Sequence, residues 1–219
     1  MPASVDILNY QHRWSNWQVR LLTSIAKHTK DIQYSIHVVQ KEGSCHKNIN
    51  RALRRVTAPY FVIMDEDAEV LQDGWLAGLC QALESDEKLG VVGARDVKTE
   101  IERDRVEEPS GVVLERVSWI PGFCMAFKRD RVMEFLRADE AIPGDMGMTD
   151  LDLCAQIQSQ GLRVARNREV VVYHPARDDD ETRAIERRPT LAKQEEWFPL
   201  QTAYMQEKWG DLFRSMVGR

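Results

Sequence analysis

The chain has 219 residues, 43% of them hydrophobic, and a formal net charge of -5. This length and composition suit one substantial domain with its own core and exclude global disorder. The acidic balance argues against a general nucleic-acid-binding surface, although it leaves room for a local basic groove.

Three further features bear on location and on metal binding. No apolar run approaches the roughly 18 residues that a membrane helix needs. The amino terminus lacks a basic start followed by an apolar stretch, so we expect no signal peptide. The four cysteines stand too far apart for a zinc knuckle. Three of them lie within apolar patterns, so we expect burial as small hydrophobic residues and a reducing, cytoplasmic environment.

The first 94 residues alternate between patterns typical of strands and helices. Strands are expected at 4–9, 34–39, 60–64 and 89–94, and helices at 17–28, 47–56 and 74–84. The run 60–64 is apolar throughout, which is typical of a strand buried on both faces. This alternation predicts an α/β fold with a doubly wound, mostly parallel sheet.

The pattern is less regular after Gly93. We expect a mobile, charged surface loop at 95–109, strands at 112–117 and 119–128, a helix at 150–161 and a last strand at 170–173. The predicted organisation is a catalytic domain at 1–175 and, at 176–219, a charged linker with a helical extension packed on it. The aromatic residues of that extension are typical of a stripe that packs on the domain. The alternatives are a homodimer contact and a lid over the site.

An acidic cluster, Asp65, Glu66 and Asp67, follows directly on the apolar run 60–64. In open parallel sheets, ligands bind beyond the carboxyl ends of the strands. Adjacent carboxylates repel each other, and a divalent cation shared with substrate phosphates relieves this repulsion. The alternatives are a solvated loop or the acidic first turn of a helix.

Two families use such a strand end. In haloacid-dehalogenase-type phosphatases the first Asp attacks phosphate, which would make Asp65 the nucleophile. However, Glu69 stands where that family has Thr or Val, and the family's motif usually lies on the first strand. The stretches 50–53, 58–67, 74–76, 119–129, 149–154 and 170–174 are together similar to another family. From residue 5 to 174 the chain resembles family 2-type glycosyltransferases of the GT-A fold, and Asp139-Glu140 resembles their rhamnosyltransferase-like branch.

This resemblance implies a metal site and a catalytic base. Asp67 would bind Mn²⁺ or Mg²⁺ directly, Asp65 would contact the ribose or the metal shell, and His174 would complete the shell. Asp150 would take the proton of the acceptor, although Thr149 replaces the family's Glu before it. The alternatives are that His174 merely closes a strand and that Asp150 merely supplies charge to a helix start. A retaining enzyme would not need Asp150 as a base.

The donor and acceptor contacts implied by the resemblance are Asn9, Tyr10, Gln40, Asn50, Asp65 and Glu66 for the nucleotide-sugar, and Trp119 and Gly122 for the acceptor pocket. Asn50 could equally cap a helix, and Trp119 could belong to the core. The predicted function is metal-dependent transfer of a sugar from a nucleotide-sugar, with UDP as the expected nucleotide, to an unknown acceptor hydroxyl. The alternatives are a phosphatase or phosphotransferase that uses Asp65 and a non-catalytic nucleotide-binding relic of the fold.

Overall fold

The computed structural model describes residues 4–11, 16–40, 43–175 and 181–218. The side chains of residues 10, 11, 40, 181–192 and 194 also lie outside the described part. Tyr10 and Gln40 are therefore placed by their backbone alone, and their predicted donor contacts stay predictions.

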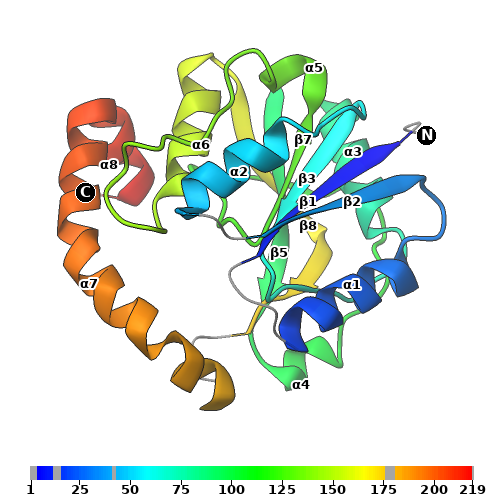
Figure 1. Cartoon of the computed structure of the whole chain (residues 1–219). Helices are drawn as coiled ribbons and strands as arrows, with labels where there is room; N and C mark the ends of the chain where they lie inside the picture. Colours follow the sequence, from blue (N-terminus) through cyan, green and yellow to red (C-terminus); the bar gives the residue numbers. More distant parts are fainter. Residues whose placement is uncertain (1–3, 12–15, 41–42, 176–180, 219) are drawn as a thin grey trace.

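A mixed sheet of eight strands forms the centre of the molecule (Figure 1). Its order is β2-β1-β3-β7-β5-β8-β4, and β6 pairs with β8 beside this path. Because β7 lies antiparallel between β3 and β5, the strands β1, β2, β3, β5 and β8 all run in one direction. The strands are β1 Val5–Gln11, β2 Tyr34–Gln40, β3 Tyr60–Met64, β4 Glu69–Val70, β5 Leu89–Val97, β6 Leu114–Arg116, β7 Cys124–Lys128 and β8 Arg163–Tyr173.

Helices cover both faces of the sheet (Figure 1). They are α1 Asn16–His28, α2 Cys45–Leu53, α3 Trp75–Ser85, α4 Glu100–Arg103, α5 Arg129–Val132, α6 Thr149–Ser159, α7 Glu181–Trp209 and α8 Asp211–Val217. On one face Phe61 and Ile63 pack with α2, α6 and α8, and on the other Tyr60, Val62 and Met64 pack with α1 and α3. Alternate side chains of β3 thus enter opposite cores, which confirms that this strand is buried on both faces.

Several expected elements differ from the observed ones, and β4 and α5 were not expected. The stretch predicted as a loop at 95–109 begins with the last residues of β5 and contains α4, which starts at a capping box of Thr99 and Glu102. The strand expected at 119–128 begins only at Cys124, and the strand expected at 170–173 begins already at Arg163. The mostly parallel α/β fold is confirmed.

The carboxyl-terminal helices extend along one side of the molecule (Figure 1). Met205, Phe213 and Met216 are buried in the same core as α2 and α6, and Tyr204 and Trp209 pack against it. The domain boundary predicted at 175 stays a prediction.

The four cysteines do not form disulfides. Cys80, Cys124 and Cys154 are buried, as the sequence predicts, whereas Cys45 at the start of α2 is half-buried. None of the helices in the described ranges combines the length and the apolar character that crossing a membrane requires.

Candidate active site

The site begins where β1 and β3 end side by side. Asn9 is paired with Met64 in the sheet and is completely buried. Its side-chain amide donates to the Met64 carbonyl at 3.1 Å and accepts from Gln18 at 3.1 Å. Asn9 therefore ties the two strand ends together directly before the acidic cluster. Its predicted contact with the nucleotide stays a prediction.

A tight turn after β3 carries the acidic cluster. The backbone N–H of Ala68 donates to the Asp65 carbonyl at 3.3 Å, and the turn leads into the short strand β4. Asp65 and Glu66 are half-buried, whereas Asp67 is only 2% exposed. A carboxylate this deeply buried is costly unless a cation or hydrogen-bond donors balance its charge.

The end of β8 brings His174 to this turn. Glu69 of β4 pairs with Tyr173 of β8, which places Asp67 next to His174. The imidazole Nε2 lies 3.3 Å from Asp67 Oδ1. The ligand atoms of Asp65, Asp67 and His174 all lie within 4.8 Å of one another. The structure thus brings together the three residues that the sequence singled out as metal ligands.

These three side chains suit a divalent cation. Carboxylate oxygens favour Mg²⁺ and Mn²⁺, and an imidazole nitrogen shifts the preference towards Mn²⁺. One cation within reach of all three ligand atoms would relieve the repulsion between the two carboxylates. With His174 as a ligand, the donor atoms would favour Mn²⁺ over Mg²⁺.

Two residues near His174 had no role in the sequence prediction. The ring of Phe123 stacks on the imidazole with centroids 5.1 Å apart. Lys98, after β5, places its ammonium 3.3 Å from His174 Nδ1 and forms an ion pair with Asp96. No sequence pattern predicts that either residue lies beside His174, because the fold brings together segments that are far apart in the chain.

Asp150, in the first turn of α6, contacts the segment Gly122–Phe123. The Gly122 N–H donates to Asp150 Oδ2 at 3.2 Å, and the Leu151 N–H donates to Oδ1 at 2.9 Å. The carbonyl of Phe123, the residue after Gly122, accepts from the Asp65 N–H at 3.3 Å. The segment Gly122–Phe123 therefore joins the predicted base to the acidic cluster.

The environment of Asp150 makes its carboxyl group a weaker acid than usual, with a raised pKa. Burial raises the pKa of Asp150, the Leu151 N–H lowers it, and the nearby Asp65 carboxylate raises it again, to about 6. Removing a carboxylate from water penalises its charged form, and a like charge adds to this penalty. A carboxyl group with a pKa near neutral pH is well suited to exchange protons with a substrate.

The other predicted contacts lie further out. The Asn50 amide donates to Ala138 O and Glu140 and accepts from Ala138 N at 2.8–2.9 Å, so it holds the segment that precedes α6. Trp119 is half-buried and packs against the core. The ligand roles of Asn50, Trp119 and Glu66 stay predictions.

The sequence matches the family model "Glycosyl transferase family 2" over residues 19–131, more than half of the chain. The chain belongs to glycosyl transferase family 2. The matched part includes Asp65 and Asp67 and ends before Asp150 and His174. The roles assigned to Asp150 and His174 therefore rest on their geometry and on the motif resemblance.

Solved structures with the same fold are glycosyltransferases. The mannosyltransferase PcManGT from Pyrobaculum calidifontis, in complex with GDP-Man and Mn²⁺, is 17% identical (TM-score 0.64), with 100% of this chain and 70% of that chain covered. GalNAc-T7 with UDP, GalNAc and Mn²⁺ is 11% identical (TM-score 0.61), with 80% and 44% covered. TarS 1-349 of S. aureus is 10% identical (TM-score 0.61), with 97% and 83% covered.

At these identities the likeness concerns the fold alone, which is that of GT-A glycosyltransferases. The present chain spans less than half the length of the GalNAc-T7 chain. No curated protein sequence matches it.

Proposed function

We propose that this chain is a metal-dependent glycosyltransferase that moves a sugar from a UDP-sugar to an acceptor hydroxyl. Asp65, Asp67 and His174 would hold Mn²⁺ or Mg²⁺. When bound, the cation would offset the negative charge that develops on the departing diphosphate. Two of the structures with this fold contain Mn²⁺ together with UDP or GDP-Man, and this supports both the metal and the class of donor.

Asp150 would accept the proton of the acceptor hydroxyl. Its carboxylate is oriented by the N–H groups of Gly122 and Leu151, and it is joined through Gly122–Phe123 to the segment that carries Asp65. The observation that supports the proposal is this junction, in which a carboxylate with a raised pKa lies near three side chains that could bind a metal. An acceptor bound over Gly122 would lie between the two.

Calorimetry with UDP, GDP and Mn²⁺ tests the donor, and UDP release from a panel of UDP-sugars tests turnover. We expect UDP to bind more tightly in the presence of Mn²⁺ and to be released from at least one UDP-sugar. The transferase proposal fails if neither nucleotide binds with or without metal. Binding without turnover would support the non-catalytic alternative. Phosphate release from an aryl phosphate, abolished in Asp65→Asn, would support the phosphatase, which the family match does not favour.

The predicted homodimer through the carboxyl-terminal helix is a separate proposal. Tyr204, Trp209 and Phe213 contact the chain's own core, so a dimer would have to use the outer side of α7, where Phe198 is 56% exposed. Sedimentation of the wild type and of Phe198→Glu tests this, because a dimer should dissociate in the variant and a monomer should be unaffected. The cytoplasmic location stays a prediction.

A further inference from the structure

The turn that precedes Asp150 has an unusual backbone. Gly144 and Gly147 have φ values of +89° and +100°, and Met148, the N-cap of α6, has a φ of +57°. A residue with a side chain in this region costs on the order of 1 kcal/mol or more, and it persists only where the surroundings enforce it. The turn at 143–148 must therefore be held in place by its neighbours.

One contact between helix α7 and the turn is a buried amide. Gln201 is 1% exposed, and its Nε2 donates to the carbonyls of Pro143 at 2.7 Å and Met146 at 2.6 Å. Two hydrogen bonds from a single side chain fix the distance between these two carbonyls. The amide of Gln201 thus acts as a clamp across the turn.

The glycines of the turn fit closely against the same helix. A Cβ atom at Gly144 would lie 2.3 Å from Cδ2 of the Trp197 ring, and one at Gly147 would lie 2.8 Å from Oε1 of Gln201. Real Cβ atoms do not come so close to other heavy atoms. The turn and α7 are therefore complementary in shape as well as in hydrogen bonding.

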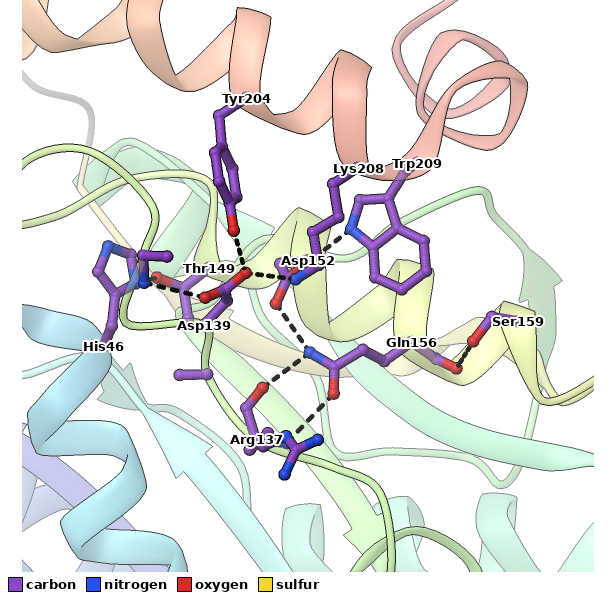
Figure 2. A network of polar contacts seen from close by, with 12 residues as sticks. His46, Arg137, Asp139, Thr149, Asp152, Gln156, Ser159, Tyr204, Lys208 and Trp209 are labelled. Atoms are coloured by element: carbon purple, nitrogen blue, oxygen red, sulfur yellow. Dashed lines mark hydrogen bonds and ion pairs between the residues drawn. The ribbon is translucent and has the colours of Figure 1, made fainter.

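Helix α2 holds the other side of the turn. The Cys45 N–H donates to the Asp145 carbonyl at 2.6 Å. The buried His46 places Nδ1 2.7 Å from the hydroxyl of Thr149, the residue directly before Asp150 (Figure 2). The turn thus lies between α2 and α7, with Asp150 at its end.

We propose that Gln201 is a positioning residue for Asp150, and that α7 is thereby part of the catalytic apparatus of this chain. Gln201 fixes the turn 143–148, and the turn fixes the start of α6 and the direction of the Asp150 carboxylate. This inference rests on the proposed function, in which Asp150 takes the proton of the acceptor.

A purely structural role for Gln201 predicts a different result, because α7 has other anchors. Tyr204 and Lys208 bind Asp139, and Lys208 and Trp209 bind the buried Asp152, at 2.6–2.8 Å (Figure 2). These contacts lie one to two turns further along α7. Loss of the Gln201 hydrogen bonds should therefore loosen the turn without detaching the helix.

The test variant is Gln201→Met, which nearly preserves the volume of the side chain and removes its donor. Gln206→Met is the matched control, since Gln206 is half-buried on the same helix and its amide donates to Gly210 O at the end of that helix. Three quantities are measured: hydrogen exchange of the amides at 144–150, affinity for UDP with Mn²⁺, and UDP release from a UDP-sugar with water as acceptor.

We expect Gln201→Met to exchange the amides at 144–150 at least tenfold faster and to lose at least tenfold in kcat. The affinity for UDP and the KM for the UDP-sugar should change less than twofold, because the donor side is not touched. The midpoint of the acid limb of kcat should also shift, whereas Gln206→Met should behave like the wild type.

Faster exchange with an unchanged kcat would overturn the inference, as would unchanged exchange. Equal losses of kcat and UDP affinity would indicate a general structural role and would also overturn it. If the wild type neither binds UDP nor releases it from a UDP-sugar, the proposed function has failed. The exchange measurement then still decides whether Gln201 holds the turn.

Discussion

Two opposing effects set the pKa of Asp150. Burial and the Asp65 carboxylate stabilise its protonated form, and two backbone N–H groups stabilise its charged form. Because its pKa is raised from 3.8 to about 6, the base is in its active carboxylate form only above about pH 6. A bound cation near Asp65 would lower this value by offsetting the like charge.

We therefore expect kcat to rise with pH along an acid limb with a midpoint at or somewhat below pH 6. Asp150→Asn should reduce kcat by about 10²-fold to 10⁴-fold and remove this limb, while the affinity for UDP with Mn²⁺ stays unchanged. Steady-state UDP release across pH 4.5–8, with calorimetry, measures both. Near-normal turnover of Asp150→Asn would contradict the assignment of Asp150 as base.

Asp67→Asn tests the metal site at nearly constant volume. The amide keeps one oxygen but loses the charge, so Mn²⁺ affinity should fall by at least tenfold and UDP binding should lose its dependence on Mn²⁺. Asp73→Asn is the control, because Asp73 is exposed and pairs with His28 and Lys30 away from the site. If Mn²⁺ still strengthens UDP binding to Asp67→Asn as in the wild type, the cation lies elsewhere.

At the level of single residues, the sequence could indicate the acidic cluster and His174 because they stand at recognisable ends of elements. It could not indicate Phe123, Lys98 or Gln201. Their contacts join segments that the sheet order and the path of the carboxyl-terminal helix bring together, and no local spacing records those distances.

Helix α7 is attached to the body of the protein by charge as well as by apolar contact. Lys208 lies 2.6 Å from Asp139 and 2.7 Å from Asp152, whose side chain is 0% exposed. Burial lowers the pKa of Lys208, but the hydrogen bonds to Asp139 and Asp152 raise it above its usual value. The ammonium is thus charged and balances a buried carboxylate.

Lys208→Met should therefore reduce the free energy of unfolding. Removing one partner of a fully buried pair costs about 3–5 kcal/mol, and because the Lys208 side chain is 27% exposed we expect about 2–4 kcal/mol. Lys193→Met is the control, since Lys193 is exposed on the same helix. Urea unfolding measures both, and equal stability of the two variants would contradict a buried charge pair.

At the level of elements, prediction was most successful where the apolar pattern was continuous, as in β3. The helix α4 was missed because its charge density favoured a loop, although Thr99 and Glu102 have the spacing of a capping box. The two-residue strand β4 has no pattern of its own, since only its pairing with β8 defines it. The start of β7 was predicted too early because the apolar residues before Cys124 lie in and before the turn that contains Gly122.

For the molecule as a whole, the contact between Asp139 and α7 makes the free energy of unfolding depend on pH. Burial alone would raise the pKa of Asp139, but Lys208 and Tyr204 hold it at about 2, below its value of 3.8 in an unfolded chain. A lowered folded-state pKa contributes stability that is complete above the unfolded pKa and is lost as the pH falls towards about 2. The contribution is on the order of 2 kcal/mol.

Asp139→Asn should accordingly be less stable than the wild type by about 2 kcal/mol at pH 6, with the difference shrinking between pH 4 and pH 2. Urea unfolding at several pH values tests this, and comparison with the variant separates Asp139 from other carboxylates. A difference that stays constant down to pH 2 would indicate that Asp139 acts through its shape and not through its charge.

The distribution of the four thiols makes the molecule suitable for selective labelling. Burial raises the pKa of Cys80 and Cys124 to about 12, and that of Cys154 also rises, so these three should react slowly with an alkylating reagent. Cys45 is half-buried, and its N–H bonds the turn at Asp145. A fluorophore attached there would report the turn's opening as it happens, in the native chain and without an introduced cysteine.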